Sequence, residues 1–291
     1  MDKSFGCLHS DFSDYKNARF VILPVPYEKT TTYIEGTAKG PEAIIEASCN
    51  MELYDEETDS NPAEAGIATL DPLVIEDAPE VMVERVKAAC TRILKDKKFP
   101  IILGGEHSVS VGFFLALKEF YKDLTVLQLD AHADLRGEYE GSRFNHACVM
   151  GRIREHADAV QVGIRSLSDE EADLIKEKYK GTVFFAHRMR DRDCTEDIIK
   201  KLGGRVYITC DMDVFDPSLI PSVGTPEPGG LGWYEVLDII RNVIEKREVV
   251  GFDAVELCPN SLNKGPDFIT AKLVYKTVGL LNSKFLLDKN K

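Results

Sequence analysis

The sequence lacks the segments that would take it into or across a membrane. No apolar stretch of its 291 residues approaches the ~20 residues that span a bilayer. The start, Met1 to Ser10, has neither the basic region nor the apolar region of a secretory signal. We therefore expect a soluble, cytoplasmic protein with no membrane partner.

Cysteines are few and scattered. They stand at positions 7, 49, 90, 148, 194, 210 and 258, an odd number with no Cys-x-x-Cys pair. This pattern argues against a disulfide framework and against a zinc–thiolate site. We expect most of the cysteines to be small core residues.

Basic residues are also in deficit. The 36 Lys and Arg against 49 Asp and Glu give a formal charge of -13. Such a balance disfavours nucleic acid as a partner, because phosphate backbones require a basic footprint. A cationic small molecule would be attracted by the same surface.

Short apolar or β-branched runs alternate with longer helical patterns along the whole chain. The expected strands are Arg19–Pro24, Pro100–Leu103, Leu124–Leu129, Ala159–Val162, Thr182–Phe185, Val206–Thr209 and Val249–Phe252. The expected helices are Pro41–Met51, Ala78–Leu94, Ser108–Phe120, Asn145–Glu155, Glu170–Lys178, Thr195–Leu202 and Trp233–Lys246. The alternation predicts an α/β fold, a three-layer α/β/α sandwich with a doubly wound, mostly parallel sheet. No linker rich in Pro, Gly or Ser divides the chain, so we expect one domain over residues 1–291.

Three of the expected strands run directly into residues that bind metal ions. In chain order these residues are His107, then Asp130, His132 and Asp134, then Asp211 and Asp213. The period of two in extended backbone points alternate side chains to one side. In an open α/β sheet, ligands bind beyond the carboxyl ends of the strands, so these side chains are expected to meet there.

Each segment alone has an ordinary structural interpretation, because a lone histidine is usually a satisfied structural residue and a lone Asp often caps a helix. Together they do not, since four carboxylates at one sheet edge would repel strongly without cations. Two divalent ions balance four carboxylates, and two neutral imidazoles complete the ligand set. Oxygen-rich, thiolate-free ligation suits manganese better than zinc. A two-metal site generates hydroxide near neutral pH, which makes hydrolysis the natural reaction class.

These segments resemble the metal-binding signatures of the ureohydrolases, the family that includes arginase and agmatinase. The matching segments are Gly104–Ser108, Asp130–Asp134 and Asp211–Pro217, and the similarity also takes in Gly36–Pro41 and Gly251–Glu256. It therefore covers nearly the whole chain. The resemblance implies an arginase-like fold and an enzyme that hydrolyses a guanidinium group and releases urea. It also implies a hydroxide that bridges two manganese ions, and a homo-oligomer, a trimer or a hexamer.

The resemblance assigns roles residue by residue. It implies that Asp130 and Asp211 bridge the two ions, with His107 and Asp134 completing one site and His132 and Asp213 the other. Asp134 is then expected to relay a proton to the departing amine and His146 to shuttle protons. Glu256 is expected to receive the guanidinium, Thr225 to face the same group, and Asn145 to contact substrate.

The far end of the substrate is less well defined by the sequence. Arg136 and the segment Gly141–Asn145 stand where arginase has groups that bind its amino acid, and the block His146–Met150 looks more like an agmatinase. Agmatine, converted to putrescine and urea in polyamine biosynthesis, is therefore the expected substrate.

Three other guanidines stay open as substrates. Arg136 or Arg143, if either faced the pocket, would favour guanidinobutyrate or arginine. Glu138 and Glu140 could meet the extended amine of aminopropylagmatine. Two readings fall outside this class. A single-zinc deacylase of similar fold would use fewer carboxylates, and a non-catalytic metal-binding regulator would have no reason to retain both His146 and Glu256.

Overall fold

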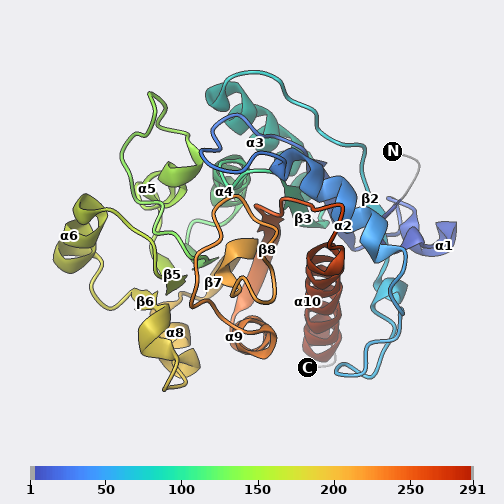
Figure 1. Ribbon diagram of the computed structural model, residues 1–291. Coiled ribbons are helices and arrows are strands. Elements are labelled where there is room, and N and C mark those ends of the chain that lie inside the picture. Colours follow the sequence, from blue (N-terminus) through green and yellow to red (C-terminus); the bar gives the residue numbers. More distant parts are fainter. Residues whose placement is uncertain (1–3, 290–291) are drawn as a thin grey trace.

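One parallel β-sheet forms the centre of the molecule (Figure 1), seen in a computed structural model that describes residues 4–289. Its eight strands run in the order β2-β1-β3-β8-β7-β4-β5-β6, and every neighbouring pair is parallel. The strands are β1 (Phe20–Val25), β2 (Ile67–Thr69), β3 (Phe99–Gly104), β4 (Leu124–Leu129), β5 (Ala159–Ile164), β6 (Val183–Phe185), β7 (Arg205–Asp211) and β8 (Glu248–Val255). All seven expected strands are present, and the predicted α/β fold is confirmed.

Helices cover both faces of this sheet, as parallel sheets require. They are α1 (Ser10–Ser13), α2 (Gly40–Ser48), α3 (Pro79–Lys95), α4 (Val109–Phe120), α5 (Val149–Ile153), α6 (Asp169–Lys178), α7 (Ala186–Met189), α8 (Thr195–Lys201), α9 (Trp233–Lys246) and α10 (Gly265–Lys289). Short 3-10 turns are Phe5–Cys7, Thr37–Lys39, Pro62–Ala65, His146–Cys148 and Met212–Val214.

The alternation of side chains along each strand produces two separate apolar cores. In β1, Phe20 and Ile22 face the core beneath α2, α9 and α10, whereas Val21 and Leu23 face the core beneath α3 and α4. Every residue of β1 is buried, which explains why the strand shows no polar alternation in sequence. The three layers of the sandwich follow from this two-sided burial.

The longest helix, α10, was missed by the sequence analysis, which assigned no element after residue 252. Its 25 residues begin at Gly265-Pro266, a favourable start because proline fits the first helical turn. Apolar residues lie all around the helix instead of forming one stripe, since α10 packs against both α2 and α9. The three-residue strand β2 was also missed, because so short a run carries no period.

The order of the strands determines where the chemistry is found. Strands β3, β8, β7 and β4 are consecutive neighbours in the middle of the sheet. Because all of them are parallel, their carboxyl ends meet at one edge. The segments that follow these four strands therefore lie together although they are far apart in sequence.

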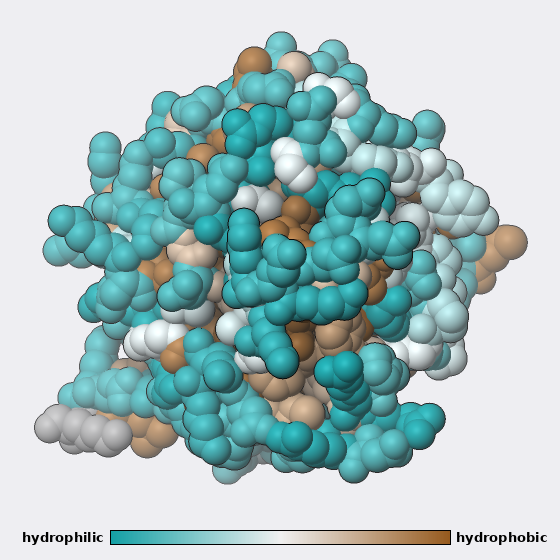
Figure 2. Space-filling view, turned by 90° about the vertical axis from the view of Figure 1, so that its left-hand side faces the viewer, coloured by the Kyte–Doolittle hydropathy of each residue, from teal (hydrophilic) through white to brown (hydrophobic). Residues whose placement is uncertain are grey.

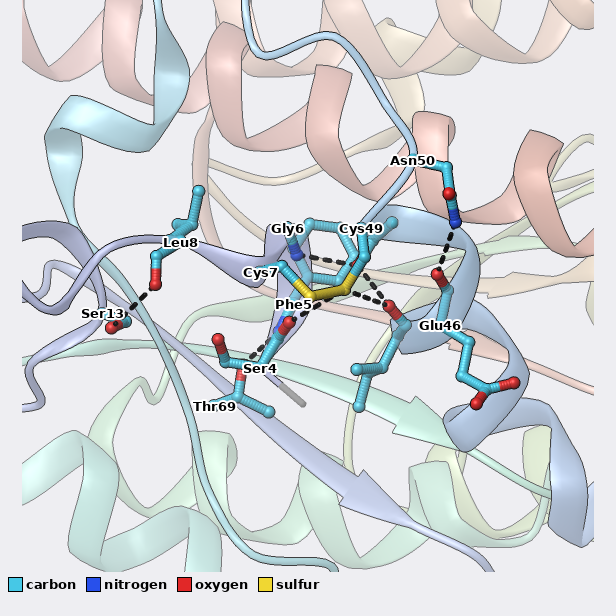
Figure 3. Close-up of a disulfide and its surroundings, with 12 residues drawn as sticks. Ser4, Phe5, Gly6, Cys7, Leu8, Ser13, Glu46, Cys49, Asn50 and Thr69 are labelled. Carbon is cyan, nitrogen blue, oxygen red and sulfur yellow. Dashed lines mark hydrogen bonds between the residues drawn. A yellow bond between two sulfur atoms is a disulfide. The ribbon is translucent and has the colours of Figure 1, made fainter. Parts of the chain in front are cut away.

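One disulfide contradicts the expectation drawn from the cysteine pattern. Cys7 of the first 3-10 turn is bonded to Cys49 at the end of α2, 42 residues away (Figure 3). Beside the bond, the amide of Gly6 donates to Ser48 Oγ over 2.7 Å. The spacing of the cysteines in the sequence does not reveal this pair, because the two residues meet only when the N-terminal 3-10 turn packs on α2. The other five cysteines are buried free thiols, as expected.

The polar surface is consistent with the acidic composition. Figure 2 shows the side of the molecule that carries α6 and α8, where hydrophilic residues predominate and apolar ones are visible mainly in recesses. Among residues 4–289, no helix combines the length and the apolar character needed to cross a membrane.

Reduction of the Cys7–Cys49 bond is expected to destabilise the protein. A cross-link that closes a loop of 42 residues contributes at most about 4 kcal/mol by restricting the unfolded chain. Thermal unfolding followed with and without dithiothreitol should show a lower Tm after reduction. The Cys7→Ser variant should have the Tm of the reduced wild type, both with and without dithiothreitol. If dithiothreitol lowered the Tm of this variant as much as that of wild type, the disulfide assignment would be wrong.

Candidate metal centre

A buried histidine at the end of β3 faces three carboxylates from other strands. His107 Nδ1 lies 3.0 Å from Asp134 Oδ2 and 3.1 Å from Asp130 Oδ2. Asp211 Oδ2, at the end of β7, is 3.4 Å from the same nitrogen. All four side chains are buried. The sequence predicted that these residues would meet, and the structure brings them together.

A second group of ligands shares one carboxylate with the first. His132 Nδ1 lies 2.7 Å from Asp213 Oδ2 and 3.7 Å from Asp130 Oδ1. Asp130 thus presents Oδ2 to His107 and Oδ1 to His132. The atoms of each group, one with His107, Asp130 and Asp211, the other with Asp130, His132 and Asp213, are close enough to hold one ion. A carboxylate with one oxygen in each group is suited to bridge two cations.

The protonation of His107 fits a metal ligand. Its Nε2 is 2.9 Å from Thr209 Oγ1, whose hydroxyl proton is donated to Asp253, so Nε2 must be the protonated nitrogen. The other ring nitrogen, Nδ1, faces three carboxylates and is buried without a hydrogen-bond partner. Burial alone would lower the pKa of this ring, but Asp130 and Asp134 outweigh it and raise the pKa well above its usual value. The carboxylates therefore require positive charge at Nδ1, which a proton, or a metal ion bound by the neutral ring, can supply. The ligand set therefore fits divalent metal ions.

Electrostatics at this edge favour positive charge. Burial, reinforced by the charge of Asp130, raises the pKa of Asp134 to about 7. Burial also raises the pKa of Asp211 well above its usual range, with the charges of Asp213 and Asp130 adding to the effect. Burial alone would lower the pKa of His132, but the nearby charge of Asp213 outweighs it and raises that pKa to about 12. The site takes up protons when no other cation neutralises it, and divalent ions would reverse these shifts.

A polar network behind His107 holds the ring in place. Asp253, in the interior of β8, accepts hydrogen bonds of 2.8 Å from Thr209 Oγ1 and from Ser110 Oγ, and the Tyr207 hydroxyl also donates to it. Asp253 is fully buried. The sequence analysis quoted Asp253 only as part of a motif. The available signal was a carboxylate within the run Val249–Val255, whose other residues carry no polar side chain.

Removing the charge of Asp253 should weaken metal binding. We expect Asp253→Asn to lower manganese affinity by about 10- to 100-fold, because such outer partners orient and polarise the ligating histidine. Calorimetric titration of the metal-free protein measures this directly. The control is Asp267→Asn, a buried carboxylate at the start of α10. Equal affinity in wild type and Asp253→Asn would rule out the role given to this network.

A cavity of about 240 Å³ opens onto the carboxylates and contains most of the expected catalytic residues. Asp134, His146, Thr225 and Glu256 all line it. Glu256 follows β8, and its Oε1 accepts the His107 amide over 2.6 Å. Asp134 and Glu256 have φ of 52° and 64°, in the left-handed region that non-glycine residues seldom occupy. Such strain is found preferentially at functional sites.

The residues of segment 136–146 have different surroundings from one another. His146 lines the cavity, and burial lowers its pKa to about 4, so the ring is neutral at physiological pH. Asn145 does not line the cavity. Its Oδ1 accepts the amide of Ala147 over 2.9 Å and so caps the 3-10 turn, and its expected contact with substrate stays a prediction. The expected helix 145–155 is in fact this turn followed by α5.

Arg136 and Arg143, the two arginines that could favour a substrate with a carboxylate, differ in their position relative to the cavity. Arg143 lies outside the cavity lining and pairs with Glu155 at 2.7 Å. Arg136 lines the cavity, with its guanidinium 4.2 Å from the centre of the Tyr139 ring and Nε 3.9 Å from Glu171.

The acidic candidates of the same loop do not reach the cavity. Glu138 and Glu140 are absent from its lining among the described residues. Glu171 and Tyr139 line it instead, and the sequence analysis had not identified either one.

Comparison with known proteins assigns the family. The model of the Arginase family matches residues 18–279, and the chain belongs to this family of metal-dependent hydrolases. The N(1)-aminopropylagmatine ureohydrolase of Synechocystis sp. is 42% identical over 277 residues, which cover 92% of this chain and 90% of that protein. The agmatinase of Pyrococcus horikoshii is 37% identical over 278 residues, covering 92% and 93%.

Solved structures agree with this assignment. The agmatine ureohydrolase of Thermoplasma volcanium superposes with a TM-score of 0.87 and 30% identity, covering 99% of this chain and 96% of that one. The arginase of Medicago truncatula gives 0.79 and 27%, covering 91% and 88%. The chain is thus a ureohydrolase of the agmatinase type, an amidinohydrolase that acts on a small guanidine.

Proposed function

We propose that this protein uses two manganese ions to hydrolyse the guanidinium group of a guanidino-amine, releasing urea and leaving a polyamine. The observation that carries the proposal is the sharing of Asp130 between two ligand groups at the floor of a cavity that Glu256 also lines. The alternative of a non-catalytic regulator has no comparable support, since it would not require Glu256 and His146 to face the metal ligands.

The ligand set suggests how the ions would be held. His107 and Asp134 would serve one ion, His132 and Asp213 the other, with Asp130 and Asp211 between them. Carboxylate and imidazole ligands without thiolate favour manganese over zinc. When bound, such ions lower the pKa of water enough to supply hydroxide near neutral pH.

The chain's own residues would orient the substrate and move protons. A planar guanidinium is best held by a carboxylate that accepts two of its hydrogen bonds. Glu256 lines the cavity beside His107 and belongs to neither group of metal ligands, so it is the carboxylate proposed for this role. Burial raises the pKa of Glu256 to about 8, and a bound guanidinium cation would favour its charged form. Thr225 borders the same space. Asp134 would pass a proton to the leaving amine, and neutral His146 would exchange protons with solvent.

The far end of the substrate is proposed to be an amine. Arg143 lies outside the cavity lining and is paired with Glu155. Arg136 lines the cavity, but Glu171 lies 3.9 Å from its Nε and also lines the cavity, so a carboxylate offsets the charge of Arg136 there. Agmatine was the first expectation from the sequence. Several relatives at 38 to 42% identity are named aminopropylagmatine ureohydrolases. We therefore propose aminopropylagmatine as the first candidate substrate and agmatine as the second. We also propose a cytoplasmic role in polyamine biosynthesis, and the expected homo-oligomer stays a prediction.

Urea release from a panel of guanidines tests the function. With added manganese, kcat/KM for aminopropylagmatine and agmatine should exceed that for guanidinobutyrate and arginine by at least about tenfold, since an unmatched carboxylate loses charged hydrogen bonds to water. Arg136→Ala is the test variant and Arg143→Ala the matched control outside the cavity. A preference for guanidinobutyrate that disappears in Arg136→Ala would overturn the amine assignment. No urea from any guanidine would overturn the function.

Glu256→Gln separates substrate binding from metal binding. The variant should lose turnover by at least about 100-fold, because an amide cannot accept two hydrogen bonds from the guanidinium. Glutamine still offers one oxygen to the His107 amide, so metal analysis at saturation should return two ions per chain, as in wild type. His132→Asn, which removes a ligand, should return fewer. Loss of manganese in Glu256→Gln would place Glu256 among the metal ligands instead.

A further inference from the structure

Glu106 is a buried carboxylate that takes no part in either group of metal ligands. It is 0% exposed although it stands directly before His107. Its Oε2 accepts the amides of Lys29 and Thr30 over 2.6 and 2.7 Å, and its Oε1 accepts the Thr30 hydroxyl over 2.8 Å. Three of the bonds to this buried anion therefore come from the loop that follows β1. The next residues of that loop, 31–34, line the cavity.

Thr30 links this carboxylate to His146. The Thr30 Oγ1 accepts the backbone amide of His146 over 2.9 Å and lies 3.2 Å from the ring Nδ1 of the same residue. A hydroxyl has one proton, and Thr30 gives its proton to Glu106. Thr30 Oγ1 can then only accept from Nδ1, so Nδ1 must be protonated. The other ring nitrogen, Nε2, is left with the lone pair.

We propose that Thr30, held by Glu106, is a positioning residue that keeps His146 as the Nδ1–H tautomer with its Nε2 lone pair toward the cavity. The inference rests on the proposed function, because it assumes that His146 shuttles protons. During a turnover, Nε2 would accept the proton that an incoming water gives up when hydroxide is regenerated, and would then release that proton to solvent. Nδ1 and the Thr30 hydroxyl would keep their protons throughout, and Glu106 would only accept hydrogen bonds.

The alternative tautomer would be disfavoured by the buried anion. With the proton on Nε2, the Nδ1 lone pair would face the Thr30 oxygen, and the hydroxyl would have to turn away from Glu106 to donate to it. Losing a buried hydrogen bond to a charged acceptor corresponds to about a 10- to 100-fold shift in population. The geometry therefore selects one tautomer before substrate arrives.

Thr30→Val removes the hydroxyl while nearly keeping the shape of the side chain. We expect kcat to fall by about 10- to 100-fold, less than the roughly 100- to 10,000-fold loss expected when the proton-transfer group is absent, because His146 would be mispositioned and not removed. The KM and manganese content should stay close to wild type. The Tm should fall by a few degrees, because Glu106 and the His146 amide each lose a buried hydrogen bond. Thr30→Ser, which retains the hydroxyl, should restore most of kcat. The matched control is Thr37→Val in the same loop, since the Thr37 hydroxyl is buried and has no hydrogen-bond partner.

A double variant tests whether Thr30 acts through His146. If it does, adding Thr30→Val to His146→Asn should cause no further loss of kcat, because residues that work as a unit are not additive. A loss in Thr30→Val that is as large with His146→Asn as without it, or that comes with lost manganese, would show a merely structural role and overturn the proposal.

The tautomer itself can be measured without turnover. Two-bond proton–nitrogen NMR spectra of the manganese-free protein distinguish Nδ1–H from Nε2–H, and His146→Asn assigns the signal among the six histidines. We expect Nδ1–H in wild type and in Thr30→Ser, and a shift toward Nε2–H in Thr30→Val. Nε2–H in wild type would overturn the proposal. If the wild-type protein released no urea, the proposed function would fail while this spectrum would still decide the tautomer.

Discussion

The burial of four carboxylates at one edge of the sheet is the constraint on which the rest of the structure depends. Removing a single charge from water costs several kcal/mol, and like charges that lie close together add to that cost. Within residues 4–289, the basic side chains that pair with these carboxylates are His107 and His132. Arg136 lies beside Glu171 and Tyr139 instead. Metal cations would supply the positive charge that this arrangement requires, and the strands, outer hydrogen bonds and strained turns present oxygens to the place where such ions could bind.

The topology places support for the site within the sheet itself. Asp253 and Thr209 are interior residues of β8 and β7, which are neighbouring strands, so the network behind His107 is as rigid as the sheet. Close backbone approach provides the other support. A Cβ on Gly105 would lie 2.1 Å from the carbonyl oxygen of Tyr27, so only glycine lets the turn after β3 touch the loop after β1. That contact allows Glu106 to reach Thr30.

The sequence was sufficient for the parts of the site that follow a local rule. The period of two grouped Asp130, His132 and Asp134 after β4 and Asp211 with Asp213 after β7, and the structure brings the two groups together. The buried strands were recognisable because they lack polar alternation. Contacts between distant segments could not be predicted in this way, because no periodicity in the sequence indicates which distant residues meet. Thr30 meets Glu106 across 76 residues and His146 across 116, and Cys7 meets Cys49 across 42. Asn145 has a residue type suited both to binding and to capping, and its capping bond to Ala147 could not be predicted from the residue type alone.

Chemistry and substrate choice therefore depend on different parts of the fold. The metal ligands and Glu256 stand at or directly beyond strand ends, where small movements are resisted by the packed sheet. The distal lining, including Tyr33, Tyr139 and Glu171, comes from loops and from the start of α6, where substitutions leave the strand register unchanged. Relatives that share about 40% of their residues with this chain can thus keep the same hydrolytic centre and still bear names for different guanidines. On the proposed function, the loops would discriminate the ends of substrates, while residues at the sheet edge would meet the guanidinium that all of them share.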